Sequence, residues 1–502
     1  MLDFTKIVRP YFRRFDRQML RAASDPEKSQ RETLASLLSE GSRTDWGRRY
    51  GFAPGLSYEQ WRERCPMVDY EAIRQDVMRM VSGEADVLWP GVTRRYAQSS
   101  GTSGGKSKYI PITRRGLASS HYRGGTDVVA RYLSLYPDSR LMSGRALILG
   151  GSMATQLPHP PGVKAGDLSA HLIECINPLA GLLRVPGKDV ALMEDWHEKL
   201  PRLVADVARR DVTNLSGVPS WMLTVLKEVL KLTGASTISE VWPRLEVFFH
   251  GGIAFGPYRE EYRRIIGTES MRYLETYNAS EGFFGVQLDP SSPAMLLLMD
   301  VDTFYELIPL GGSPEDAIPA WEAKPGKVYE LVITSSNGLW RYRIGDTIHI
   351  HSTAPLTFTI AGRTQQYINA FGEELMVHNA EAAFARACAA TGASAANFTA
   401  APVYPTPSTR GRHEWLIEWT TPPADAEAFA EALDRALRDE NSDYDAKRSG
   451  GIFLDRLTII PLAPGTFDRW LASTGKLGGQ RKVPRLCPDR RYIDPIKSFA
   501  TE

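Results

Sequence analysis

YAQSSGTSGGKSKYIP, residues 96–111, is the stretch of this 502-residue sequence that says most about its fold. From Ser99 to Lys108 it holds five hydroxyl side chains, three glycines and two lysines. Glycines let backbone N–H groups approach an anion closely, and the side chains add donors and positive charge. The segment YIPIT that follows is strand-like. The order of residues therefore predicts a phosphate-binding loop that leads into a strand, rather than a flexible Ser/Gly surface loop.

A second kind of phosphate loop, the P-loop GxxxxGK[ST], shares the ending Gly105-Lys106-Ser107. The first glycine of that pattern would stand at position 100, which is a serine. A P-loop also needs a strand, the loop and a helix in that order. Here VTRRYAQ before the loop is a poor buried strand, and the segment after it is strand-like. The sequence therefore argues against a P-loop kinase or ATPase.

The residues on either side of this loop differ in pattern. Residues from about Asp3 to Val81 repeat apolar positions about every 3.6 residues and are predicted to be mainly helical. From Tyr96 onward, β-rich runs such as RALILGG and LEVFFHGG alternate with helical stretches, which is typical of an α/β domain with buried sheets. The pattern breaks around Gly362-Arg363. We therefore predict an α/β fold with a large domain over residues 1–361 and a smaller α+β domain over residues 362–502.

Composition and charge limit the classes of function. With 43% hydrophobic and 24% charged residues, the chain is expected to be a soluble globular protein. A net charge of +1 gives no sign of a nucleic-acid binder, and no run of about 18 apolar residues predicts a membrane span. The widely spaced Cys65, Cys175, Cys388 and Cys487 exclude CxxC metal sites and do not suggest a disulfide framework, so a cytoplasmic location is expected. No heptad seam stands out, so a monomer is the default.

The loop resembles the phosphate loop of adenylate-forming enzymes, whose pattern is close to [ST]SG[TS][ST]GxxK. Four further segments follow in the order of that superfamily: YNASEG at 277–282, WRYRIGD at 340–346, Gly362-Arg363 with Gly372-Glu373 and Glu381, and Gly475-Lys476 with QRKVPR at 480–485. Each segment alone is a weak signal, but five in order across about 390 residues are a strong one. The residues of these five segments are most similar to those of the auxin-responsive acyl acid amido synthetases of plants and their bacterial relatives.

This resemblance implies a large N-terminal adenylate-forming domain, with β-sheets flanked by helices, and a smaller mobile α+β C-terminal domain. It implies a ligase that uses ATP and Mg²⁺ to convert a carboxylic acid to an acyl-adenylate and then passes the acyl group to an amine, with an amino acid expected. One alternative is an acyl-CoA-ligase-like enzyme that makes a thioester. A second is a nucleotide-binding protein without catalysis. None of these readings involves nucleic acid or a membrane.

The resemblance also implies roles for individual residues. Tyr277 would stack near the adenine, and Ser280 would reach the α-phosphate. Glu281 would hold Mg²⁺, a hard cation suited to carboxylate and phosphate oxygens. Asp346 would accept hydrogen bonds from the two ribose hydroxyls. The full set implied for nucleotide binding is Ser99, Ser100, Gly101, Thr102, Ser103, Lys106 or Lys108, His250, Gly251, Gly252, Tyr277, Ala279, Ser280, Tyr342, Asp346 and Arg363.

Several of these residues also have structural explanations that the sequence leaves open. Tyr277 could be a core aromatic residue, Glu281 a solvated carboxylate at a helix start, and Asp346 a turn residue after a glycine. His250-Gly251-Gly252 follows the apolar strand LEVFF. It fits a strand-ending turn as well as it fits a wall of the adenine pocket.

Two features depart from the plant pattern. No lysine lies near Phe371-Gly372-Glu373, so other residues must neutralise phosphate charge there. The catalytic lysine near the C-terminus is either Lys476, after Thr-Gly as in acyl-CoA ligases, or Lys482, whose KxPR context favours it. The sequence does not identify the acid. Candidate neighbours of the acyl group are Arg123, Met153 and Trp221, for each of which a core role is equally open.

Overall fold

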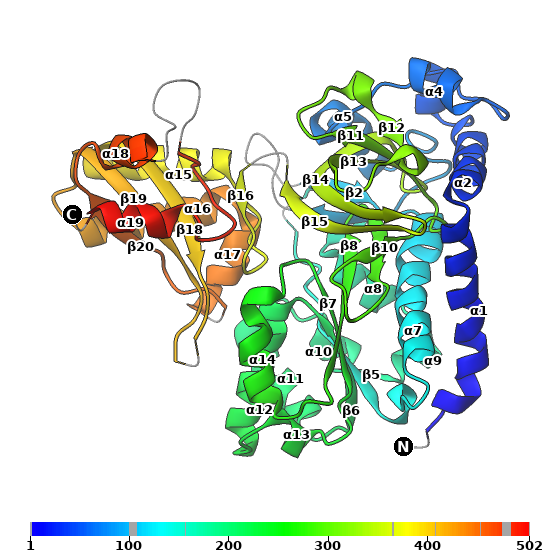
Figure 1. Cartoon of the computed structure of the whole chain (residues 1–502), viewed down its shortest axis with the longest axis horizontal. Coiled ribbons are helices and arrows are strands. Elements are labelled where there is room, and N and C mark those ends of the chain that lie inside the picture. The colour runs from blue at the N-terminus through cyan, green and yellow to red at the C-terminus, as the bar shows by residue number, and fades with distance from the viewer. Residues whose placement is uncertain are drawn as a thin grey trace. The chain divides into compact units, whose positions relative to one another are not determined.

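The computed structural model describes residues 3–99, 108–155, 157–363, 366–406, 408–451, 453–473 and 483–500. The chain forms two compact units (Figure 1). The first comprises Met1–Ser99, Lys108–Gly252 and Arg263–Thr364, and the second includes Ile253–Tyr262 and the C-terminal residues from 366 onward. The domain ranges 1–361 and 362–502 and the mobility of the second domain stay predictions. Predicted site residues that lie outside the described residues are Ser100, Gly101, Thr102, Ser103, Lys106, Lys476 and Lys482.

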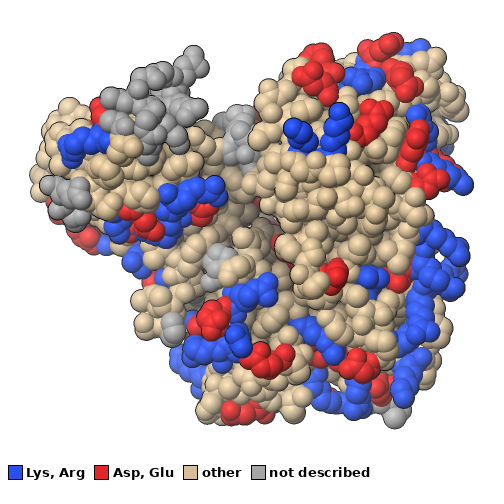
Figure 2. Space-filling view, viewed as in Figure 1, with Lys and Arg blue, Asp and Glu red and all other residues tan. Residues whose placement is uncertain are grey.

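The first unit begins with helices, as predicted. They are α1 (Thr5–Ser24), α2 (Pro26–Gly41), α3 (Asp45–Arg49), α4 (Tyr58–Arg64) and α5 (Tyr70–Val81). Side chains of Asp25, Thr44, Ser57 and Asp69 cap the last four of them, which satisfies backbone N–H groups that a helix start leaves without partners. Figure 2 shows positive and negative side chains mixed over the viewed face, in keeping with the net charge of +1.

A 12-stranded sheet forms the centre of the first unit, in the order β12-β11-β13-β14-β15-β10-β9-β8-β7-β6-β3-β5. Its strands are β3 (Arg145–Ile148), β5 (Arg184–Val185), β6 (Val212–Gly217), β7 (Val247–Gly251), β8 (Arg272–Ala279), β9 (Gly282–Gln287), β10 (Met295–Leu297), β11 (Thr303–Pro309), β12 (Ile318–Pro319), β13 (Val328–Ser335), β14 (Leu339–Thr353) and β15 (Leu356–Arg363). Strands β5, β3, β6, β7 and β8 run parallel, and the remaining pairs are antiparallel. Consequently, the carboxyl ends of the five parallel strands lie along one edge.

Helices and a smaller sheet complete the first unit. The helices are α6 (Arg114–Gly116), a π-helical segment η1 (Leu117–Tyr122), α7 (Arg123–Leu135), α8 (Leu168–Cys175), α9 (Pro178–Gly181), α10 (Lys188–Ala191), α11 (Trp196–Val207), α12 (Pro219–Thr233), α13 (Ile238–Val241) and the end of α14 (Arg259–Ile266). Figure 1 shows α1 running alongside α7. The small sheet has the order β2-β1-β4, with β1 (Arg95–Ser99), β2 (Lys108–Pro111) and β4 (Lys164–Gly166).

Strand β1 corrects one expectation. The segment RYAQS, read as a poor strand, lies between β2 and β4 and pairs with both. Tyr96 and Ala97 are fully buried, and the Tyr96 hydroxyl donates to the carbonyl of Thr93 at 3.1 Å. Two buried side chains and a paired strand on each side are sufficient to form a short strand. The segment after the loop is strand β2 rather than a helix, so the exclusion of a P-loop is confirmed.

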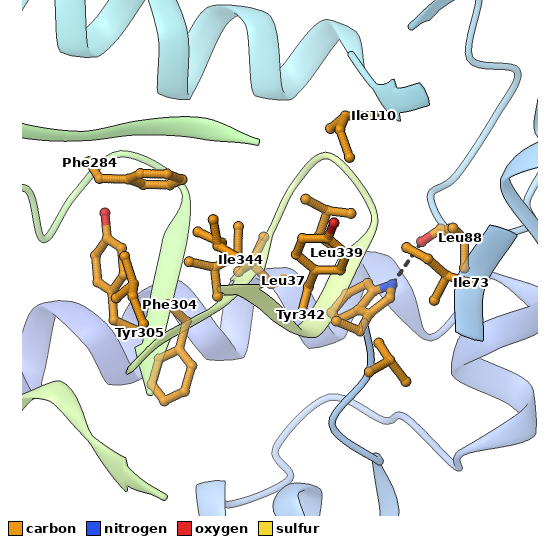
Figure 3. Packing of buried hydrophobic residues seen from close by; sticks show 14 of the residues in the cluster. Leu37, Ile73, Leu88, Ile110, Phe284, Phe304, Tyr305, Leu339, Tyr342 and Ile344 are labelled. Atoms are coloured by element: carbon orange, nitrogen blue, oxygen red, sulfur yellow. Dashed lines mark hydrogen bonds between the residues drawn. The ribbon is translucent and has the colours of Figure 1, made fainter. Parts of the chain in front are cut away.

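A large apolar cluster joins the N-terminal helices to the antiparallel strands (Figure 3). Trp340 of β14 donates its indole N–H to the carbonyl of Leu88 at 2.9 Å and packs edge-on against Phe52. A Cβ at Gly41 would lie 2.4 Å from the Trp340 ring, so this position of α2 requires glycine. The same cluster contains Tyr342, which is fully buried.

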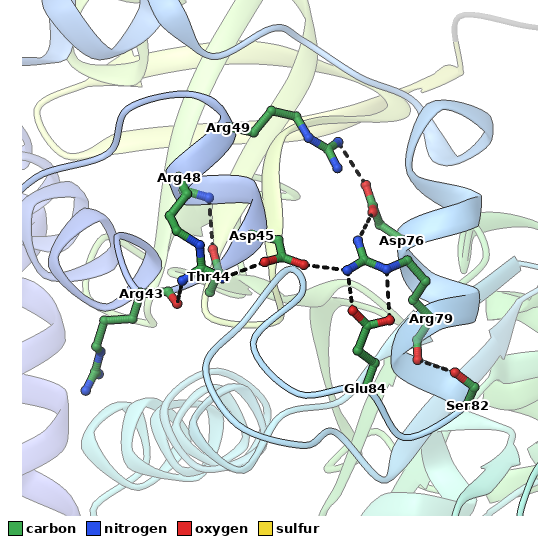
Figure 4. A network of polar contacts seen from close by, with 10 residues as sticks. Arg43, Thr44, Asp45, Arg48, Arg49, Asp76, Arg79, Ser82 and Glu84 are labelled. Atoms are coloured by element: carbon green, nitrogen blue, oxygen red, sulfur yellow. Dashed lines mark hydrogen bonds and ion pairs between the residues drawn. The ribbon is translucent and has the colours of Figure 1, made fainter.

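A polar network outside this core joins α3 to α5 (Figure 4). Arg79 pairs with Asp76 at 2.9 Å and also contacts Asp45 and Glu84. Solvent screens the exposed members of this network, so its ion pairs contribute little to stability.

The two arginines of WRYRIGD belong to the scaffold. Arg341, at φ 44°, makes two hydrogen bonds of 2.9 Å to Glu306, and both side chains are buried. Its third nitrogen donates to the carbonyls of Arg62 and Cys65. Arg343 makes a similar bidentate pair with Glu330, at 2.9 and 2.7 Å, but 39% of its side chain is exposed.

Arg341→Met is expected to lower the free energy of unfolding by roughly 3 to 5 kcal/mol, because it leaves the Glu306 carboxylate charged and unpaired in the interior. The comparison is Arg343→Met, whose guanidinium is 39% exposed, so water can replace part of its interaction with the buried Glu330 and a smaller loss is expected. Urea unfolding followed by tryptophan fluorescence measures both. Equal losses in the two variants would contradict the assignment of Arg341 to the buried scaffold.

The second unit is α+β, as predicted. Its three-stranded sheet has the order β18 (Ser394–Val403), β19 (Arg412–Thr421), β20 (Thr458–Leu462), and its other elements are β16 (Tyr367–Ile368), β17 (Leu375–Met376), α15 (Val377–Thr391), α16 (Ala426–Glu440), α17 (Ser442–Arg448), α18 (Thr466–Ser473) and α19 (Ile493–Ala500). Glu373 is fully buried, accepts from the backbone N–H of Phe371 at 2.6 Å and lies 2.8 Å from Nε2 of His413. The Gly372-Glu373 segment is therefore anchored to β19.

Candidate functional site

The glycine-rich and polar segments singled out in the sequence lie at the carboxyl ends of neighbouring parallel strands. β7 ends in His250-Gly251, and β8 runs directly into Ser280-Glu281. The two strands are paired, with Gly251 opposite Thr276. In open α/β sheets, ligands bind outside the carboxyl ends of the strands. The fold therefore brings the HGG and YNASEG segments together at the edge where a ligand is expected.

Glycine is required where β7 ends. A Cβ at Gly251 would lie 2.3 Å from the carbonyl oxygen of Thr276, and Gly252 has a φ of 83°. His250 is buried, and its carbonyl accepts from the Thr276 hydroxyl at 3.1 Å. These contacts account for the strand-ending turn. A role for the three residues in walling the adenine pocket stays a prediction.

Glu281 lies in the two-residue turn between β8 and β9, so the alternative of a helix-start carboxylate is wrong. Its side chain is buried, with 6% of the residue exposed. Its carbonyl accepts a hydrogen bond of 3.1 Å from the side-chain amide of Asn337, which in turn accepts from the backbone N–H of Thr113. Asn337 is fully buried. The position of the Glu281 turn is therefore set by a residue in the turn between β13 and β14.

The π-helical segment η1 supports the same turn from another side. The Ser120 hydroxyl accepts from the backbone N–H of Phe283 at 3.0 Å, and Nδ1 of His121 lies 3.3 Å from the side-chain oxygen of Asn278. Burial lowers the pKa of His121 to about 4, so the imidazole is neutral at neutral pH. π-helical segments often occur at functional sites.

Sequence reasoning missed Asn337, Ser120 and His121. The Asn337-Gly338 dipeptide between two apolar strands is a strong hairpin signal and could have located Asn337. No local pattern marks the π-helical segment.

Tyr277 and Asp346 meet although 69 residues separate them. The Tyr277 hydroxyl donates to Oδ2 of Asp346, and the ring packs against Phe284 and Phe358 at 5.1 and 6.1 Å between centroids. Strands β14 and β8 are four steps apart in the sheet, which would be about 19 Å in a flat one. The sheet must therefore curl strongly between them.

The surroundings of these two residues decide between earlier alternatives. Asp346 lies inside β14, opposite Arg363 of β15, so the turn interpretation is wrong. Tyr277 is 6% exposed and is part of the apolar cluster that also holds Trp340 and Tyr342, so it has a core role. Stacking on adenine stays a prediction for Tyr277, as does nucleotide contact for Asp346, Arg363, Ala279 and the buried Tyr342. Ser99 pairs with Lys108 across β1 and β2, so these two residues flank residues 100–107.

Tyr277→Phe is expected to raise the KM for ATP several-fold while kcat and the melting temperature change little. The hydroxyl orients the Asp346 carboxylate, and loss of one hydrogen bond to a charged group costs about 1.5 to 3 kcal/mol at most. Pyrophosphate exchange at varied ATP measures the effect. An unchanged KM would mean that Asp346 does not hold the nucleotide.

Polar residues also anchor the turn after β3. Lys199 is almost completely buried and donates from Nζ to the carbonyls of Gly150 and Gly151 at 2.7 and 3.3 Å. Burial lowers its pKa to about 8.

Of the residues considered as neighbours of the acyl group, Arg123 forms ion pairs with Asp127 and Asp300.

No helix in the described part of the chain is both long and apolar enough to cross a membrane. All four cysteines are free thiols, two of them buried.

The sequence matches the GH3 family N-terminal domain over residues 16–198, the central domain over residues 296–363 and the C-terminal domain over residues 378–491. A probable indole-3-acetic acid-amido synthetase, GH3.1 of Oryza sativa subsp. japonica, is 25% identical over 91% of this chain and 86% of its own length. The jasmonoyl–L-amino acid synthetase JAR6 of Nicotiana attenuata is 22% identical over 65% and 67% of the respective chains.

Solved structures share the fold. The acyl acid amido synthetase AtGH3.15 in complex with 2,4-DB superimposes with a TM-score of 0.62 at 18% identity, over 96% of this chain and 95% of the other. A 2-hydroxyisobutyryl-CoA ligase in complex with 2-HIB-AMP and CoA has a TM-score of 0.58 at 14% identity, over 95% and 94%. The predicted adenylate-forming fold is confirmed, and the relatives are amido synthetases, as the sequence motifs predicted. The three family domains in their order, together with these relatives along most of the chain, show that the chain belongs to the GH3 family.

Proposed function

We propose that this chain is an ATP-dependent amido synthetase that activates a carboxylic acid as an acyl-adenylate and transfers the acyl group to an amino acid. The observation that supports the nucleotide site best is the contact between Tyr277 and Asp346, because Tyr277 lies on β8 just before the Glu281 turn. Two buried carboxylates and a hydroxyl are placed by the strands of one sheet. The names of the relatives support an amino acid as the acceptor.

The residues suit the chemistry of the first half reaction. Attack of a carboxylate on the α-phosphate of ATP brings two anions together, so the protein must neutralise charge and hold the reactants in line. Asp346 offers two oxygens for the ribose hydroxyls. Residues 99–108 supply hydroxyls and lysines to the phosphates, and Lys482 supplies a further positive charge at the α-phosphate.

Glu281 fits a Mg²⁺ ion. The ion is usually bound through one or two carboxylates together with phosphate oxygens, and Glu281 presents a carboxylate from a turn whose backbone is fixed by Asn337. When bound, Mg²⁺ neutralises phosphate charge. The chain's own contribution is to hold that carboxylate at the carboxyl end of β8.

The decisive experiment supplies purified protein, ATP and Mg²⁺ with a panel of carboxylic acids and measures acid-dependent pyrophosphate exchange. Sustained AMP release should then require an added amino acid mixture. AMP release with coenzyme A alone would make the protein a thioester-forming ligase. ATP binding without exchange for any acid would make it a nucleotide-binding protein without catalysis. A monomer in the cytoplasm is part of the proposal, and light scattering tests the oligomeric state.

A further inference from the structure

Arg184 of β5 is a buried cation without a partner in the described residues. Only 5% of the residue is exposed, and its Nε and Nη1 lie out of solvent without a hydrogen-bond partner there. The two other buried arginines are satisfied: Arg341 pairs with Glu306, and Arg9 donates to three backbone carbonyls. Arg184 thus differs from every other buried arginine that the structure describes.

The register of the sheet shows what lies beside Arg184. Ala146 of β3 is the partner of Arg184 on one side and of Asn214 on the other. Paired residues of neighbouring strands point to the same face, so Arg184 and Asn214 flank a small side chain with their Cα atoms about 10 Å apart. Asn214 is buried and donates to the Thr213 hydroxyl at 3.1 Å. A guanidinium and an amide therefore point to the same side of the sheet, on either side of the short side chain of Ala146.

This face continues to the edge that carries the candidate site. Ile148 and Ser216 are paired two residues further along β3 and β6, on the same face, and both are partly exposed. Two residues of strand span about 7 Å. Arg184 and Asn214 therefore lie two to three residues back from the strand ends at Ile148 and Gly217.

An unpaired guanidinium in this position is costly. Arginine stays charged in proteins, and removal of an unpaired charge from water costs several kcal/mol. Burial lowers the pKa of Arg184, and the attraction of Asp189 opposes that shift. A carboxylate is an anion that a guanidinium binds through strong charge-assisted hydrogen bonds, so one placed here would offset the cost.

We propose that Arg184, with Asn214, binds a second carboxylate of the acyl substrate, so that the acid activated by this enzyme is a dicarboxylic acid. The inference rests on the proposed function, because it assigns the acid of that reaction. One carboxylate reacts with ATP beyond the strand ends, and the other is held beneath β3 by Arg184. The arrangement discriminates against acids without the second charge, because they leave the guanidinium unpaired.

The first test compares matched acids of equal chain length, such as hexanedioic with hexanoic acid and decanedioic with decanoic acid, in pyrophosphate exchange. The wild type should favour the dicarboxylic member of at least one pair by at least about tenfold in kcat/KM. Arg184→Met should remove this preference and leave the KM for ATP unchanged. Arg145→Met, a partly exposed arginine on β3, is the matched control and should behave as wild type.

The second test is thermal melting without substrate. Replacing an unpaired buried charge by methionine should leave the melting temperature equal or higher, whereas loss of a structural arginine would lower it. A lower melting temperature together with equal losses for both acids would overturn the proposal. A wild-type preference for the monocarboxylic acids would do the same.

Failure of the proposed function would look different, because no acid would then support exchange. In that case calorimetric titration with the same dicarboxylic acids still tests Arg184. Binding by the wild type that is lost in Arg184→Met would support the site, and equal heats in the two proteins would reject it.

Discussion

Asp346→Asn and Glu281→Gln are each expected to slow acid-dependent pyrophosphate exchange strongly. The expected loss of transition-state stabilisation is roughly 2 to 4 kcal/mol in each variant. Each variant removes a charge from the reacting complex and keeps the shape of the side chain. Asparagine at position 346 still offers an oxygen to the Tyr277 hydroxyl. Glutamine at position 281 leaves the backbone contact of the turn to Asn337 intact. Stability should therefore remain close to that of the wild type.

Circular dichroism and melting curves provide the check on folding, and Glu322→Gln, an exposed carboxylate of the same unit, is the control for a change of charge alone. The two variants should differ in their dependence on metal. Excess Mg²⁺ should partly restore Glu281→Gln, because the residue is proposed to bind the ion, and should not restore Asp346→Asn. Near-normal exchange in either variant would mean that the nucleotide site is misplaced.

Lys482→Ala should slow acid-dependent pyrophosphate exchange by one to several orders of magnitude and leave transfer from a supplied acyl-adenylate to the amine largely intact. A lysine that reaches the α-phosphate serves only the adenylating arrangement, if the C-terminal domain alternates between two positions as hinge-closing enzymes do. Within the second unit, Arg485 contacts Gln366, which follows the predicted hinge at Gly362-Arg363. The backbone N–H of Arg485 donates to the Gln366 side chain at 2.7 Å. Arg485 also pairs with Glu381 at 3.4 Å.

Lys476→Ala is the comparison, and it should have a much smaller effect on exchange. The reverse ranking would assign the catalytic role to Lys476 and make the C-terminus resemble that of acyl-CoA ligases. Equal impairment of both half reactions by Lys482→Ala would indicate a shared site without alternation of the domain.

Motif order was sufficient to predict the family and its amido synthetase relatives, because each segment can be recognised from the type and order of its residues alone. A phosphate loop needs small residues, hydroxyls and positive charge, and SSGTSGGKSK supplies them in sequence. The α/β class followed from apolar periodicity for the same reason. Errors arose where pairing across the sheet decided the outcome. RYAQS became strand β1 because β2 and β4 lie on both sides of it, and Asp346 lies within a strand because β15 pairs with it.

The sequence by itself determined which residues are able to bind phosphate, ribose and metal, since these properties belong to the side chains. Only the tertiary structure decided which of them meet. A curled sheet brings Tyr277 to Asp346, and Asn337 fixes the Glu281 turn through contacts between residues 56 positions apart. The structure alone also distinguished arginines of the same kind in sequence. Arg341 pairs with Glu306, while Nε and Nη1 of the buried Arg184 have no hydrogen-bond partner among the described residues. The physical reason is that burial and pairing depend on neighbours in space, which local sequence patterns do not encode.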